Sequence, residues 1–212
     1  MADALRQITG SQSGRQVVAA PEQRVAQRFT LLIRAAKIIS SEAEFLCVIR
    51  DASATGLAVT VFHKLPDEAR FVIEFQNGDR LDAVRVWERE GRAGFQFNAP
   101  ADIARIIESP SEFTKRPMRV SLERNGMLHV GLNAYEVDLL NISQQGAMIR
   151  CKANLEIDRK VRLKVQGLPE LQAKVRWRGG GQTGLVFENT LQLNELAALV
   201  AAFHGLPPIL AG

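Results

Sequence analysis

The sequence of 212 residues lacks any apolar run long enough to cross a membrane. A membrane-spanning helix needs roughly 18 or more consecutive apolar residues. The first 16 residues, MADALRQITGSQSGRQ, also lack the apolar stretch of a secretory signal. We therefore expect a cytoplasmic protein without a membrane span.

Cysteine and histidine are scarce, with two and three residues respectively. Neither Cys47 nor Cys151 has a C-x-x-C partner, and no two histidines stand at the spacing of metal ligands. No serine or cysteine has a recognisable acid–base partner, which nucleophilic catalysis would need. The sequence thus predicts no metal site, no cofactor, no catalytic residues and no enzymatic activity.

Aromatic residues make up only 6% of the chain, whereas the net charge is +4 and the pI is about 9.4. The positive charge favours an anionic partner, although 27 basic against 23 acidic residues also fits an ordinary solvated surface. A barrel that binds RNA or single-stranded DNA needs aromatic side chains among basic ones. The sequence shows no such cluster, which argues against nucleic acid; strongly salt-dependent binding to generic oligonucleotides would favour it.

An internal repeat sets the architecture. Gly56 and Trp87 are 31 positions apart, as are Gly146 and Trp177, and each tryptophan is followed seven positions later by a glycine. The chain therefore contains two copies of one unit, offset by 90 residues, with a one-residue difference in length further upstream. We expect both tryptophans, which have apolar neighbours, to lie in the cores of their units.

Each copy has the two-residue periodicity of strands. Six segments in each copy fit this pattern: 29–39, 44–51, 56–62, 70–75, 80–89 and 93–97, then 120–130, 135–142, 146–151, 160–165, 170–177 and 183–188. Helical patterns follow at 100–108 and 191–203, and the second has Leu191, Leu193, Leu196, Leu199 and Val200 on one face. The sequence predicts a mainly β protein with two tandem six-stranded antiparallel β-barrels, each followed by a helix.

The composition divides the chain into four parts. Residues 1–20 are polar and predict a flexible N-terminal tail, and residues 109–117 predict a linker. The two domains are then expected at 21–108 and 118–212. The stretch GGGQTG at 179–184 matches a dinucleotide-binding pattern, but it stands between two predicted strands and is interpreted as a hairpin turn.

Two motifs in the first copy occur in a fixed order. Arg24 and Arg28 form R-x-x-x-R directly before the first strand, and Asp51, Ser53 and Gly56 form D-x-S-x-x-G. This combination resembles the PilZ domain family, whose members bind the bacterial second messenger cyclic di-GMP. The resemblance implies that these five residues bind the nucleotide.

The residue types suit such a ligand. An arginine fork matches O6 and N7 of guanine and can stack on a purine. Asp51 can accept from guanine N–H groups, and Ser53 can donate to a phosphate or brace the turn. Gly56 allows either a close backbone approach or a backbone angle that a side chain would penalise. Plain turn chemistry remains an alternative reading of Asp51 and Ser53.

The second copy keeps only part of the pattern. Asn141, Ser143 and Gly146 fit D/N-x-S-x-x-G, and Arg119 matches Arg28. Lys115 stands where the first arginine is expected, and an ammonium lacks the planar fork of a guanidinium. We therefore expect a weaker or silent second site at Lys115, Arg119, Asn141, Ser143 and Gly146.

The resemblance implies a receptor that binds cyclic di-GMP mainly through its first domain. The hypothesis for signalling is ordering of the loop around Arg24 and Arg28, with rearrangement of the two domains and passage of the signal to an unidentified protein partner. The alternative is a degenerate adaptor that binds a protein partner without nucleotide. Motility, polysaccharide export and transcription are all open as the downstream process.

Overall fold

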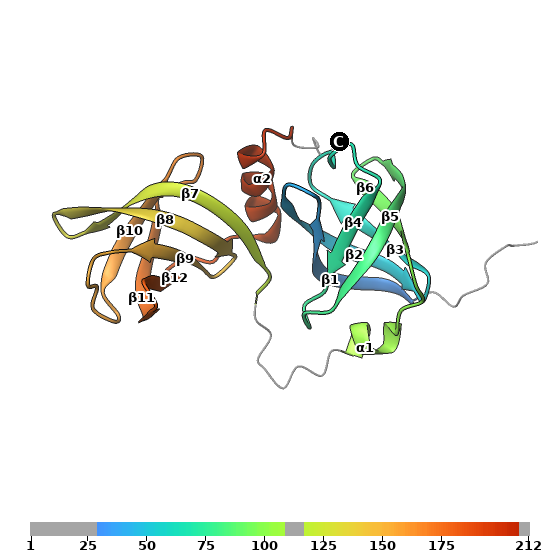
Figure 1. The fold of residues 1–212 in the computed structure, drawn as a ribbon, viewed down its shortest axis with the longest axis horizontal. Coiled ribbons are helices and arrows are strands. Elements are labelled where there is room, and N and C mark those ends of the chain that lie inside the picture. The colour runs from blue at the N-terminus through green and yellow to red at the C-terminus, as the bar shows by residue number, and fades with distance from the viewer. Residues whose placement is uncertain (1–28, 109–116, 208–212) are drawn as a thin grey trace, which may run out of the picture.

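The computed structural model describes residues 29–108 and 117–207 (Figure 1). The first described part is a closed antiparallel barrel with the strand order β1-β2-β3-β6-β5-β4. Its elements are β1 (Phe29–Ile39), β2 (Glu44–Ser53), β3 (Gly56–Val61), β4 (Arg70–Glu74), β5 (Arg80–Arg89), β6 (Arg92–Phe97) and the short helix α1 (Ile103–Glu108).

The second described part is another closed antiparallel barrel, with the order β10-β11-β12-β9-β8-β7. Its elements are β7 (Arg119–Val130), β8 (Asn133–Ser143), β9 (Gly146–Cys151), β10 (Lys160–Val165), β11 (Leu171–Gly179), β12 (Gln182–Phe187) and the helix α2 (Leu193–Phe203). The predicted fold class is confirmed. The predicted tail at 1–20 and nearly all of the predicted linker lie outside the described residues.

The alternation of side chains explains the strands. In β10, KVRLKV, the two lysines and the arginine face solvent while Val161, Leu163 and Val165 are buried. A strand with this period buries one face only, and closing six such strands into a barrel leaves no exposed sheet edge. The hairpin predicted at GGGQTG is also confirmed, since Gly180 and Gly181 between β11 and β12 both have positive φ.

The two barrels repeat each other in detail. In β2, Asp51 pairs with Ala58, and in β8 Asn141 pairs with Met148, with a β-bulge before each. The one-residue difference in length lies in the bulges of β1 and β7. Between Thr30 and Arg34 the first strand carries one residue more than the second does between Ser121 and Arg124. The structure therefore aligns Phe29 with Val120.

The helix α2 lies between the two barrels and packs on β2 of the first (Figure 1). Its buried residues are Leu196, Ala197, Val200 and Ala201, so the buried face is rotated from the one predicted. On β2, Leu46 and Val48 are also buried, next to core residues that face the barrel interior. At the matching positions of β8 the chain has Glu136 and Asp138. The apolar outer face of β2 thus explains why the helix packs on the first barrel.

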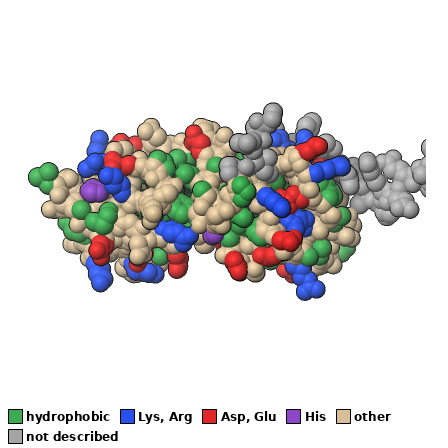
Figure 2. Space-filling model, turned by 90° about the horizontal axis from the view of Figure 1, so that it is seen from above, with side chains coloured by type: hydrophobic (Ala, Val, Ile, Leu, Met, Phe, Trp, Pro, Cys, Tyr) green, Lys and Arg blue, Asp and Glu red, His purple; other side chains and the backbone are tan. Residues whose placement is uncertain are grey.

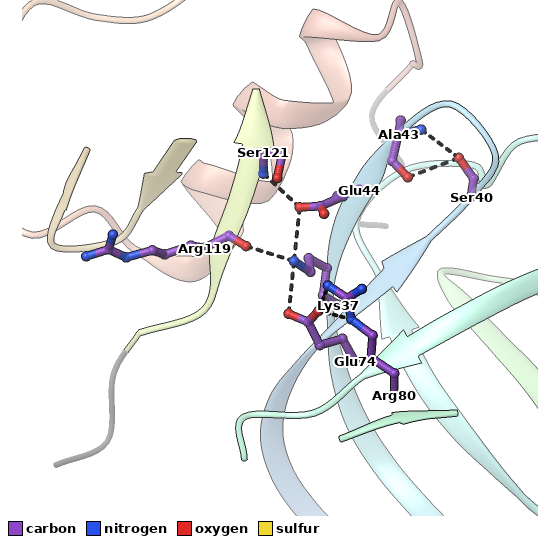
Figure 3. A network of polar contacts seen from close by, with 8 residues as sticks. All are labelled: Lys37, Ser40, Ala43, Glu44, Glu74, Arg80, Arg119 and Ser121. Atoms are coloured by element: carbon purple, nitrogen blue, oxygen red, sulfur yellow. Dashed lines mark hydrogen bonds and ion pairs between the residues drawn. The ribbon is translucent and has the colours of Figure 1, made fainter. Parts of the chain in front are cut away.

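A buried lysine joins the barrels beside this helix (Figure 3). Lys37 is 4% exposed, and its Nζ lies 3.0 Å from Glu44 Oε2, 2.9 Å from Glu74 Oε1 and 3.1 Å from the carbonyl oxygen of Arg119. The backbone N–H of Ser121 donates to Glu44 Oε2 at 2.7 Å. The ammonium has three acceptors for its three protons, and one acceptor belongs to the other barrel.

Two histidine rings pack against Phe45 of β2, next to Glu44. The ring of Phe45 lies 4.5 Å from that of His63 and 5.5 Å from that of His204, measured between centroids. His63 Nδ1 donates to the carbonyl of Lys64 at 2.8 Å, while Nε2 of each histidine is buried without a hydrogen-bond partner among the described residues. Burial lowers the pKa of both imidazoles; Glu88 opposes the shift at His63, and Arg124 adds to it at His204.

Acidification from pH 7 to pH 5 is therefore expected to weaken the junction. Because the folded state lowers these pKa values, the unfolded chain binds more protons once the pH falls below about 6.5, and the free energy of unfolding decreases. Urea denaturation at both pH values measures the decrease, and His204→Gln should make it smaller. An equally steep pH dependence in His63→Gln/His204→Gln would contradict this assignment.

No helix among the described residues is long and apolar enough to span a membrane. On the face shown in Figure 2, lysine and arginine side chains are interspersed with aspartate and glutamate. Such mixing is typical of an ordinary solvated surface.

Candidate functional site

A cavity of about 270 Å³ opens on the first barrel where β2, β3, β5 and β6 meet. Asp51, Ser53 and Gly56 of the D-x-S-x-x-G motif all line it, together with Trp87. The structure thus brings three of the predicted site residues together and adds the indole of Trp87, which was predicted to lie in the core.

Ser53 braces the turn between β2 and β3. Its Oγ donates to the carbonyl of Gly56 at 3.3 Å and accepts from the backbone N–H of Thr55 at 3.4 Å. In the second barrel, Ser143 Oγ donates to the carbonyl of Gly146 at 3.1 Å. Both hydroxyls are buried and serve the same local contact, so turn chemistry accounts for the serine of both motifs.

The glycine of each motif makes room for a neighbouring strand. Neither Gly56 nor Gly146 has a positive φ, so no special backbone angle requires glycine here. A Cβ on Gly56 would collide with the backbone carbonyl oxygen of Phe95 in β6, and one on Gly146 would collide with that of Leu185 in β12. Of the two roles expected for this glycine, the structure shows a close backbone approach, made by the protein's own sheet.

Asp51 and Asn141 occupy the first position of the motif, the one of its three defined positions at which the two barrels differ. Each follows a β-bulge, which changes the direction of side chains along a strand. Asp51 lines the cavity of the first barrel. Asn141 Oδ1 is buried and has no hydrogen-bond donor among the described residues. A carboxylate and an amide oxygen therefore occupy the equivalent places, and both are acceptors.

The prediction that both tryptophans lie in the barrel cores is wrong. Trp87 is 38% exposed and Trp177 is 37% exposed. A side chain on Gly94 would collide with the indole of Trp87, and one on Gly184 with that of Trp177. The two indoles therefore rest against glycines on the outside of the barrels. The glycine seven positions after each tryptophan was the sequence signal for this contact.

The basic residues of the predicted sites are only partly described. Arg24, Arg28 and Lys115 lie outside the described residues. Arg119 is the exposed first residue of β7 and pairs in the ladder with Ser143. The second barrel therefore brings the end of its arginine motif beside the turn of its N-x-S-x-x-G motif.

Within residues 29–108 and 117–207, no three histidine, cysteine, aspartate or glutamate side chains are grouped as a metal site would require. Cys47 is buried, and burial raises the pKa of its thiol to about 12, although a backbone hydrogen bond from Ala36 opposes the shift. A thiol with so high a pKa is a poor nucleophile.

The cavity of the first barrel offers hydrogen-bond acceptors and the aromatic face of Trp87, a set of groups suited to binding a ligand.

In a comparison with known proteins, residues 114–204 match the model of the PilZ domain. Among solved structures, Borreliella burgdorferi PlzA in complex with c-di-GMP is 10% identical, with a TM-score of 0.35, covering 82% of this chain and 88% of PlzA. The K. pneumonia MrkH–c-di-GMP complex is 13% identical, with a TM-score of 0.35 and the same coverages. Bacillus subtilis MotI/DgrA, an inhibitor of motility, is 12% identical, with a TM-score of 0.34, covering 82% of this chain and 96% of that chain. No curated protein sequence matches.

Proposed function

We propose that the protein is a non-enzymatic receptor for cyclic di-GMP, because residues 114–204 match the PilZ domain model and the first barrel repeats the topology of the second. The observation that carries this proposal is the cavity of the first barrel, which gathers Asp51, Ser53 and Gly56 beside the exposed indole of Trp87.

The cavity supplies contacts that a guanine nucleotide can use. The carboxylate of Asp51 can accept from guanine N–H groups. The indole of Trp87 offers a face on which a base can stack, a contact worth about 1–3 kcal/mol per base. Backbone pairing supports a further contribution from R-x-x-x-R, because Phe29, the residue directly after Arg28, pairs with Ala52 in the middle of the other motif. Arg24 and Arg28 then bind guanine and phosphate.

The first barrel is the main site in this proposal. It has both arginines of the R-x-x-x-R pattern, whereas the second has Lys115 at the first position. A lysine can meet a phosphate, but it cannot make the bidentate contact that an arginine makes with a guanine edge. The remaining residues of the second site, Arg119, Asn141, Ser143 and Gly146, bind more weakly.

The signal is proposed to be ordering of the loop that carries Arg24 and Arg28, followed by rearrangement of the two barrels. The junction supports a link between site and domain arrangement. Arg119, the last residue of the second arginine motif, accepts a hydrogen bond from Lys37 of the first barrel through its backbone carbonyl. A ligand that moves this part of the chain changes the contact between the barrels. Hydrogen exchange of residues 21–28 and small-angle scattering, with and without ligand, test the two steps separately.

Binding itself is tested by calorimetric titration of cyclic di-GMP into the purified protein, with GTP as the control ligand. We expect Arg28→Ala to remove the high-affinity binding, because it removes a charge-assisted bidentate contact. Arg119→Ala, the matched change in the second barrel, should leave that binding in place. Quenching of Trp87 fluorescence in a Trp177→Phe background gives an independent reading at the cavity.

Absence of heat and of fluorescence change in the wild-type protein would overturn the proposal. The motif would then serve the turn and the sheet alone, through its serine and its glycine respectively. The protein would be an adaptor that binds a protein partner without nucleotide.

A further inference from the structure

Each barrel has a β-bulge directly before its tryptophan, so that two consecutive residues there are exposed. The register shifts between Arg85 and Trp87 in β5, and again between Val175 and Trp177 in β11. A bulge of this kind re-aims side chains and interrupts the alternation of the strand. Both the bulged residue and the tryptophan after it are consequently exposed in each barrel.

The bulged residue differs between the two barrels. In the first it is Val86, which lines the cavity beside the D-x-S-x-x-G motif. In the second it is Arg176. The strands around the two positions pair in the same register: Trp87 with Gly94, and Trp177 with Gly184. Arg176 therefore takes the place at the second motif that a valine takes at the first.

The guanidinium of Arg176 is available for a ligand. Its side chain is exposed, and it has no ion pair or hydrogen bond with any residue in the described parts of the chain. Some other arginines of this barrel have side-chain partners. Arg150 pairs with Asp138 at 3.2 Å, and Arg178, two positions along β11, donates to Asn154.

We propose that Arg176 is a ligand-binding residue of a second guanine-nucleotide site on the second barrel, and that it supplies the planar cation which Lys115 cannot. This inference rests on the proposed function. Two further groups of the same barrel fit such a ligand. Asn141 Oδ1 is buried without a donor among the described residues, so it suits a guanine N–H. Trp177 offers an exposed indole face beside Arg176. A phosphate or a guanine edge can take both N–H groups of the guanidinium.

The test is calorimetric titration of cyclic di-GMP in the Arg28→Ala background, where the first barrel is silent. We expect the remaining, weaker binding to fall by roughly 10- to 100-fold in Arg28→Ala/Arg176→Val, because a charge-assisted contact is lost. Valine is the residue that the first barrel carries at this position. Arg28→Ala/Arg178→Val is the matched control, since it removes one positive charge from the same strand, and its affinity should stay within about twofold.

The outcomes separate the two proposals. Equal affinity with and without Arg176→Val, or an equal loss in the Arg178→Val control, overturns the role of Arg176. Binding of one equivalent by the wild type and none by Arg28→Ala also overturns it, while the proposed function stands. No binding by the wild-type protein overturns the proposed function as well.

Discussion

Replacing Lys37 by methionine is expected to lower the free energy of unfolding by about 3–5 kcal/mol and to separate the two barrels. Lys37 is 4% exposed, and its ammonium is bonded to Glu44, Glu74 and the carbonyl of Arg119. Methionine fills a similar volume but donates nothing, so two carboxylates and a carbonyl lose their partner in a protected place. The second barrel carries Met127 at the same position of its repeat, which shows that the barrel itself accepts this side chain.

The charges around Lys37 explain why its removal is costly. Burial works to raise the pKa of Glu74, but hydrogen bonds and charge from Lys37 and Arg80 outweigh it and hold the pKa below its ordinary value. Lys37 is one cause of this lowering, so its removal leaves Glu74 with Arg80 as its only cation among the described residues and removes the ammonium that lies between Glu74 and Glu44. Their mutual repulsion adds to the lost hydrogen bonds, and the Glu44 carboxylate that accepts from Ser121 N–H no longer has a fixed position.

The measurement uses the single tryptophan of each barrel. Chemical denaturation followed by Trp87 in a Trp177→Phe background reports the first barrel, and small-angle scattering reports the separation of the two. Arg80→Met is the matched control: it also removes a cation from Glu74, but Arg80 is exposed and contacts no residue of the second barrel among those described, so the loss should stay within about 1 kcal/mol. Unchanged stability and scattering in Lys37→Met would show that α2 alone holds the junction.

The repeat made most of the fold predictable from sequence. A constant offset of 90 residues and alternating side chains identified the barrels, and strands such as 80–89 and 160–165 were placed with their observed bounds. Alternation is informative because a barrel buries one face of every strand. Alternation does not predict which element covers an apolar residue on the outer face of a barrel. Leu46 and Val48 marked a strand, but nothing local indicated that α2 would cover them.

The candidate site was predictable only in part. Spacing located Asp51, Ser53 and Gly56, because the motif is continuous in sequence. Trp87 was assigned to the core because its apolar neighbours suggested burial, whereas a bulge in β5 turns it outward. Bulges depend on the pairing of two strands, and a single strand's sequence does not reveal them. The contact of Lys37 with Arg119 also could not be predicted, because it joins residues of different barrels and depends on how the barrels pack.

Gly56→Ala is expected to destabilise the first barrel by about 1–3 kcal/mol or more. The new methyl group would meet the backbone carbonyl of Phe95, which is fixed in the ladder between β3 and β6. A carbonyl held in a ladder cannot rotate away as a side chain can, so the two strands must move apart. Denaturation followed by Trp87 measures the loss. Gly146→Ala, followed by Trp177 in a Trp87→Phe background, should give a similar loss in the second barrel, because Leu185 stands in the same relation to it.

Gly179→Ala serves as the control, since nothing lies within 4 Å of a Cβ at that position and its φ is not positive. Its effect should stay within about 0.5 kcal/mol. A Gly56→Ala protein that keeps its stability but loses cyclic di-GMP would contradict the structural role and assign the glycine to the ligand. If instead both motif glycines prove equally necessary for stability, a glycine at this position indicates only the close approach of two strands. It does not indicate that the barrel binds a nucleotide. The residues that distinguish a binding barrel from a silent one are then Asp51 or Asn141, the loop arginines and the residue at the bulge before each tryptophan.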